Sequence, residues 1–75
     1  MKSPIEMYVI EQVRRIRAEQ HISQAMLAYG IGVTKGFIGQ AESPKSPTKY
    51  NLNHLNEIAK YFNCRLIDFF PEKPL

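Results

Sequence analysis

The stretch that decides the fold is Ile22–Glu42, with the sequence ISQAMLAYGIGVTKGFIGQAE. Ser23 is a predicted helix N-cap, because a serine hydroxyl accepts a hydrogen bond from a free backbone N–H of the first turn. Gly32 is a predicted helix end, since glycine adopts a positive φ without a Cβ clash. Between these two residues, apolar side chains recur at helical spacing: Met26, Leu27 and Ile31.

A second short helix is predicted directly after this glycine. Thr34 offers its N-cap. Its apolar side is formed by Phe37, Ile38 and Ala41. Two capped helices joined through a glycine make a helix-turn-helix.

This pattern resembles the helix-turn-helix domains of the phage repressor and Cro type, also called xenobiotic-response-element-like regulators. The residues at the family's spacing are Ser23-Gln24, Leu27-Ala28, Gly32-Val33-Thr34, Ile38 and Glu42. The match continues over nearly the whole chain, at Val13, Ile16, Arg17, Leu55, Ile58-Ala59, Phe62, Leu66 and Phe70. The resemblance implies an all-α, five-helix repressor-like bundle, and residues 1–75 form one domain.

A longer helix is predicted before the motif. Ser3-Pro4-Ile5-Glu6 has the pattern of a capping box with proline at the first helical position. The helix is expected to run to about Glu19 or Gln20. Its apolar face is Ile5, Val9, Val13 and Ile16, and its outer face is a solvated run of charges, Glu11, Arg14, Arg15 and Glu19.

Two elements are predicted after the motif. Residues 43–50 form a loop, since they contain two prolines, and Pro44 falls near where the family commonly has a glycine. Asn51 is the predicted N-cap of the next helix, which Asn63 ends. Its apolar face is Leu52, Leu55, Ile58, Ala59 and Phe62. Residues 66–70 are predicted as a short final helix stopped by Pro71, and residues 71–75 as a frayed tail.

The charge balance favours a polyanionic partner. Ten basic and seven acidic side chains give a net charge of +3. No stretch of about 18 apolar residues exists, so we expect no membrane span. The start has no apolar region of a signal peptide, and Cys64 is alone, so a reducing, cytoplasmic compartment is expected.

The sequence offers little for catalysis. An enzyme needs a nucleophile, a base and an orienting group, or a metal. His21 and His54 fall on separate elements, and Cys64 is predicted to be a small core residue. We therefore expect no enzymatic activity, no metal, no cofactor and no small-molecule ligand.

The resemblance implies how double-stranded DNA would be bound. If the second helix of the motif enters the major groove, the family's base-reading positions match Lys35, Gly36, Gly39 and Gln40, with Phe37 near a thymine methyl. Phosphate contacts are expected from Ser23, Gln24, Thr34, Lys45, Ser46, Thr48 and Lys49. The resemblance also implies an ion pair between Arg17 and Glu42, which would fix the reading angle of this helix.

The two glycines on this helix leave two interpretations open. Each costs roughly 1 kcal/mol of helix stability relative to alanine and offers no side chain to a base. Bare backbone either lets the helix approach DNA closely or marks a face that has lost base reading.

The leading hypothesis is a sequence-specific DNA-binding regulator that acts as a homodimer. Phe69 is expected to close the core, whereas Phe70 and Leu75 are expected at the self-interface. The alternative is a protein-interaction module, for example the partner-binding part of an antitoxin or phage regulatory pair.

Overall fold

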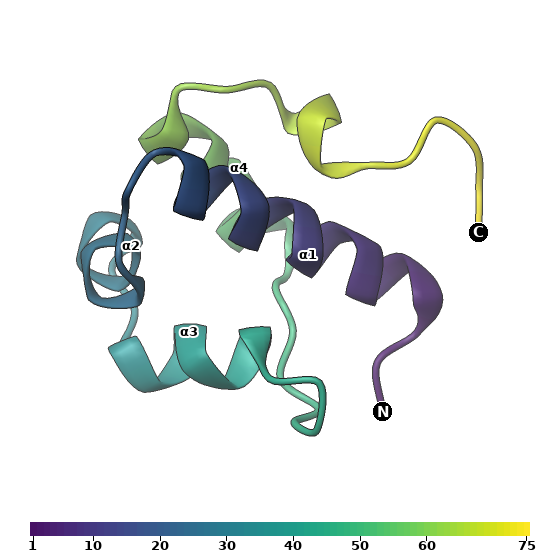
Figure 1. Cartoon of the computed structure of the whole chain (residues 1–75), viewed down its shortest axis with the longest axis horizontal. Coiled ribbons are helices and arrows are strands. Elements are labelled where there is room, and N and C mark those ends of the chain that lie inside the picture. Colours follow the sequence, from purple (N-terminus) through teal and green to yellow (C-terminus); the bar gives the residue numbers. More distant parts are fainter.

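The computed structural model describes all 75 residues, and every regular element in it is helical. The elements are α1 (Pro4–Glu19), α2 (Gln24–Ile31), α3 (Lys35–Glu42), α4 (Leu52–Phe62) and a 3-10 helix, η1 (Leu66–Phe69). Figure 1 shows α1 crossing the middle of the molecule, with α3 on one side of it and η1 on the other. Each helix falls short of the length and apolar character that crossing a bilayer requires.

The predicted helix boundaries are confirmed at their caps. Each α-helix begins after a residue whose side chain accepts a first-turn N–H: Ser3, Ser23, Thr34 and Asn51. Gly32 and Asn63 end α2 and α4 in the left-handed conformation, with φ of 75° and 55°. His21 adopts the same conformation just after α1, with φ of 57°, and no sequence signal marked it.

The prediction of an all-α bundle with five helices is confirmed in part, for its first four helices. Residues 66–70 are not a short α-helix, because only one 3-10 turn forms and it ends at Phe69. Phe70 is extended, with φ of −111° and ψ of 148°. It precedes Pro71, whose ring disfavours the helical region for the residue before it.

The core is formed by one face of each helix. Its members are Val9, Val13, Ile16, Leu27, Ala28, Ile38, Leu55, Ile58, Ala59, Phe62 and Phe69. The prediction that Phe69 closes this core is confirmed, since its side chain is fully buried. Cys64 packs partly buried against the core, and this burial raises the pKa of its thiol.

Three residues predicted on apolar faces are exposed instead. They are Ile5, Met26 and Leu52, with 37%, 48% and 78% of their area exposed. Each belongs to the first turn of its helix. The apolar periodicity extends into this turn, but neighbouring helices do not cover it. Ile10 of α1 is buried although it lies beside the predicted face.

Candidate nucleic-acid interface

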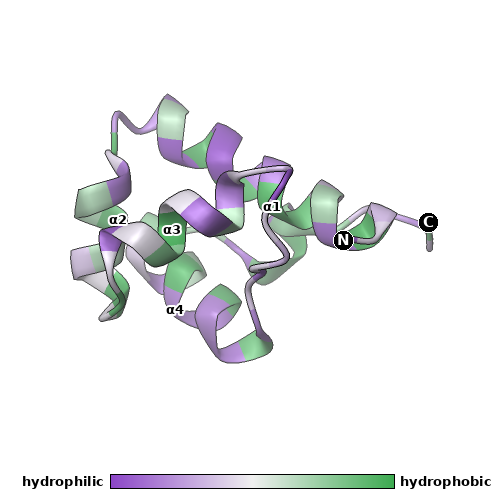
Figure 2. Cartoon of the chain, turned by 90° about the horizontal axis from the view of Figure 1, so that it is seen from below, coloured by the Kyte–Doolittle hydropathy of each residue, from purple (hydrophilic) through white to green (hydrophobic).

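The packing of α3 determines which of its residues face outward. Ile38 and Ala41 are fully buried and anchor the helix to the core. Lys35, Gly36 and Gln40 are consequently exposed. Figure 2, seen from below, shows α3 lying in front of the other helices, so that this side of it is uncovered.

The outward side of α3 carries bare backbone at its two glycines. A Cβ added to Gly36 would lie 3.9 Å from Thr34 Oγ1, its nearest neighbour. One added to Gly39 would lie 3.5 Å from Gln24 Oε1. Both distances are ordinary van der Waals contacts, so nothing within the chain demands glycine at either residue. Gln40 donates no side-chain hydrogen bond within the chain and is free to bind a partner.

The side chain of Phe37, which was expected near a thymine methyl, packs within the chain. Its ring packs against His54, with centroids 4.7 Å apart, and against Tyr50, with centroids 6.0 Å apart. The side chain therefore lies between α3 and α4 on the edge of the core, partly buried. This packing leaves the side chain of Phe37 only partly exposed.

A polar network joins α1, α2 and α3 behind this face. Arg17 donates from Nε and Nη2 to the two carboxylate oxygens of Glu42, at 2.9 Å each. Arg17 Nη1 also donates to the Ile22 carbonyl at 2.8 Å. Gln24 Nε2 donates to Glu42 Oε1 at 3.1 Å. An amide has two N–H donors, so Gln24 retains one that is free to reach a phosphate.

The residues of the loop after α3 that were expected to contact phosphates differ in burial and in their partners. Ser46 is buried, and its hydroxyl accepts a hydrogen bond from the Thr48 N–H at 3.2 Å. Ser46 therefore stabilises the loop, and we no longer propose that it contacts a phosphate. Lys49 forms an ion pair of 2.8 Å with Glu6 of α1, whereas Lys45 is exposed and has no acidic partner.

The net positive charge gathers around α3. Six of the seven acidic side chains each pair with one basic side chain. Only Glu72 remains unpaired among the acids. The basic residues without an acidic partner are Lys2, Lys35, Lys45 and Lys73. Three of these four lie on α3 or beside its C-terminal end, and of the three Lys35 and Lys45 are exposed whereas Lys2 is buried.

Lys2 is the one residue of this region that the sequence pattern missed. It is only 7% exposed, and its ammonium donates to backbone carbonyls at the C-terminal end of α3, including Ala41 O at 2.7 Å. The contact joins residues 39 apart in sequence, and no periodicity or motif signals such a pair. The one hint was the absence of a glycine after α3, which leaves carbonyls in need of a donor.

The structure brings together no metal-binding cluster. No three His, Cys, Asp or Glu side chains lie close enough to hold an ion. His54 has a local role instead: its Nδ1 accepts the Asn51 N–H at 3.1 Å and completes the cap of α4.

Comparison with known families agrees with this geometry. The model of the Cro/C1-type HTH DNA-binding domain matches residues 12–71. No curated protein matches the chain in sequence. The matched region contains α2, the turn, α3 and both partners of the Arg17–Glu42 ion pair. It covers most of the chain and confirms the resemblance seen in the sequence, so this protein belongs to the Cro/C1-type helix-turn-helix family of DNA-binding domains.

Proposed function

We propose that the chain is a sequence-specific transcriptional regulator that reads the major groove of double-stranded DNA with α3. The observation that carries this proposal is the charge distribution around that helix. Three of the four cations that acidic side chains leave unpaired lie on α3 or beside its C-terminal end, next to an outward face that is otherwise uncharged. Such a field attracts the phosphate backbone of DNA on either side of the groove.

The contacts in this proposal fall into two groups. Base edges are met by the outward residues of α3: Lys35, Gly36, Gly39 and Gln40. Glutamine suits adenine N6 and N7, and lysine suits guanine O6 and N7. Phosphates are met by the N-terminus of α2 and by the flanking polar groups: Ser23, Gln24, Thr34, Lys45 and Thr48. Lys49 belongs to this group only if a phosphate displaces Glu6 from it.

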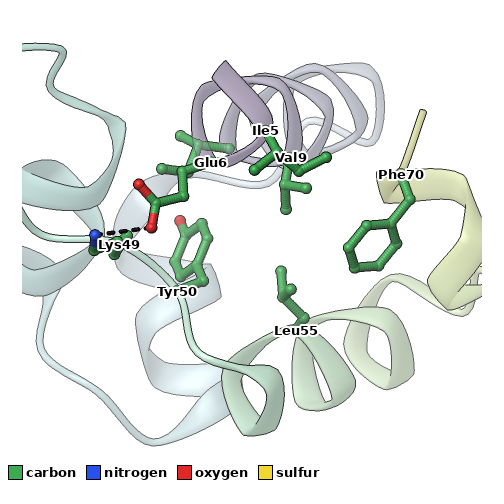
Figure 3. Close-up of a pocket in the computed structure, with 8 residues that line it drawn as sticks. Ile5, Glu6, Val9, Lys49, Tyr50, Leu55 and Phe70 are labelled. Carbon is green, nitrogen blue, oxygen red and sulfur yellow. Dashed lines mark ion pairs between the residues drawn. The ribbon is translucent and has the colours of Figure 1, made fainter. Parts of the chain in front are cut away.

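We further propose a homodimer, because one helix-turn-helix contacts few base pairs and two-fold assembly doubles the site. Its contact surface would be the hollow of about 140 Å³ bordered by Ile5, Leu55 and Phe70. Figure 3 shows these side chains around the hollow, with Phe70 at one edge. The hollow is lined by residues of α1, α4 and the loop before α4 and by Phe70, and by no residue of α3, so pairing there would not use α3.

The test incubates the purified protein with a pool of random-sequence duplexes and recovers the DNA that binds. The affinity for the selected site is then measured over a range of salt concentrations. A regulator enriches one motif, and its logarithmic affinity falls linearly with the logarithm of salt concentration. Salt-dependent binding without an enriched motif would refute sequence specificity.

No binding to any duplex would favour the alternative, a protein-interaction module. A specific observation supports that alternative: α2 has no charged residue and exposes Tyr29 and Met26 by 92% and 48%.

A further inference from the structure

The C-terminal end of α3 lacks the usual means of satisfying its carbonyls. Helices commonly end in a glycine that adopts the left-handed conformation. The N–H groups of this glycine and of the following residue then donate hydrogen bonds to the last carbonyls of the helix. Here Ser43 follows α3 in an extended conformation, with φ of −82° and ψ of 124°. Pro44 comes next and has no N–H to donate. Only the Ser43 N–H turns back, to Gln40 O at 3.2 Å.

Lys2 supplies the donors that are missing there. Its ammonium donates to Ala41 O at 2.7 Å, to Gln40 O at 3.4 Å and to Ser43 O by a short contact. An ammonium has three donors, so these carbonyls use all of them. The positive charge also lies at the negative end of the α3 dipole.

We propose that Lys2 is a positioning residue for DNA binding, which caps α3 from the N-terminal segment and fixes the loop that carries Lys45. This inference rests on the proposed function of α3. The last turn of α3 bears Gln40 and Glu42, and Lys45 follows three residues later. Fraying of that turn would therefore displace one base-reading residue and one phosphate-binding residue together.

Lys2 acts through α3 and not on a phosphate. It is buried, and its donors are all used within the chain. Its loss should lower affinity for DNA without reducing the number of counterions released on binding. A phosphate-binding lysine would behave differently, since its loss reduces the salt slope by about one.

The experiment compares Lys2→Met with Lys73→Met. Both substitutions remove one unpaired positive charge, but Lys73 lies exposed in the tail. In Lys2→Met we expect amide exchange in the last turn of α3 to accelerate about tenfold or more, as loss of charge-assisted hydrogen bonds implies. Affinity for the selected duplex should fall by a similar factor with an unchanged salt slope. Lys73→Met should leave amide exchange as in the wild type.

A measurement on the wild type keeps the inference testable if Lys2→Met does not fold. Nitrogen-15 relaxation should show the Lys2 ammonium to be motionally restricted and the Lys73 ammonium to be free. Equal mobility of the two, unchanged amide exchange in Lys2→Met, or a flattened salt slope would each overturn the inference.

These failures differ from failure of the proposed function. If the wild type binds no duplex while the Lys2 ammonium is restricted, the DNA-binding role of α3 is refuted, and with it the effect of Lys2 on DNA. If the wild type binds duplex DNA and Lys2→Met binds equally well, only the positioning role is refuted.

Discussion

Arg17 of α1 binds Glu42, the last residue of α3, through two parallel hydrogen bonds of 2.9 Å. The two side chains are only 15% and 6% exposed. Planar, bidentate pairing fixes direction as well as distance, and here it joins the side of α1 to the C-terminal end of α3. The net energy of this ion pair is reduced by desolvation, because removing two charges from water offsets much of their attraction.

The first prediction concerns this ion pair. Arg17→Ala leaves the Glu42 carboxylate buried without its partner, so we expect a loss of about 3 kcal/mol in the free energy of unfolding. In a double-mutant cycle with Glu42→Ala, the two losses should be non-additive by about 1 kcal/mol or more. Urea denaturation measures all four proteins.

The Arg15–Glu19 pair on the same helix is the matched control. Its distance is also 2.9 Å, but its side chains are 50% and 60% exposed. Solvent screening and side-chain entropy limit such a pair to about 0.5 kcal/mol. Equal coupling energies in the two cycles would contradict the structural role given to Glu42.

The second prediction concerns Tyr50. Its hydroxyl oxygen is buried and has no hydrogen-bond partner. Burial, followed by the negative charge of Glu42, raises the pKa of Tyr50 well above its usual value. Because an unpaired buried hydroxyl is unfavourable, Tyr50→Phe should increase the free energy of unfolding by about 1 kcal/mol. Tyr29→Phe, at a residue 92% exposed, should change nothing, and destabilisation by Tyr50→Phe would reveal a partner for the hydroxyl.

Local chemistry explains why so much of the fold could be predicted from the sequence. A cap such as Ser23 or Thr34 bonds to an N–H three residues away, so the four helix starts follow from short patterns. The core faces follow from periodicity within each helix.

The remaining features depend on contacts between distant residues. Lys2 donates a hydrogen bond to Ala41 of α3, which lies 39 residues later in the sequence. The side chain of Phe37 faces the core edge because of Tyr50 and His54, which lie beyond the loop. In a helix, Phe37 lies at the border between the buried and outward sides, and its own sequence context did not decide between them. Ser46 is buried by the path of a loop that contains two prolines and has no periodicity to interpret.

The third prediction concerns self-association. Phe70 is 37% exposed and borders the hollow beside Ile5. If this surface joins two copies, Phe70→Ser should sediment as a monomer with unchanged helical content. Tyr29→Ser removes an exposed aromatic side chain from α2 and should remain a dimer. A wild-type protein that is monomeric both at high concentration and on DNA would refute the interface.

The fourth prediction concerns how the free energy of unfolding depends on pH under acidic conditions. The hydrogen bond from Lys49, together with the Ser3 backbone N–H, lowers the pKa of Glu6 to about 2 from 4.5. A carboxyl whose folded pKa is depressed contributes stability above its unfolded pKa. That contribution is lost as the pH falls from about 4.5 to about 2.

Glu6→Gln should therefore show a shallower loss of stability over this acid range, measured by thermal unfolding at successive pH values. Glu72→Gln is the control, because Glu72 forms no ion pair. Glu11 and Asp68 also have lowered pKa values, so part of the acid slope should survive. An identical profile in Glu6→Gln and the wild type would mean that the Lys49 contact does not persist in solution.

The fifth prediction concerns what α3 reads. One bidentate glutamine–adenine contact discriminates between bases by about 1–3 kcal/mol. Gln40→Ala should accordingly relax selection at one base position per half-site and leave non-specific affinity nearly intact. Selection on a random duplex pool followed by binding titrations measures both quantities.

Gly36→Ala and Gly39→Ala provide the opposing test. Alanine favours the helix by about 1 kcal/mol over glycine, and both added methyl groups have room within the chain. Both variants should thus be more stable than the wild type, so any loss of affinity must come from a methyl group that blocks the approach of DNA. If both alanine variants and Gln40→Ala bind the selected site as well as the wild type, α3 does not read sequence. The uncharged outer side of α2 would then become the surface to test for a protein partner.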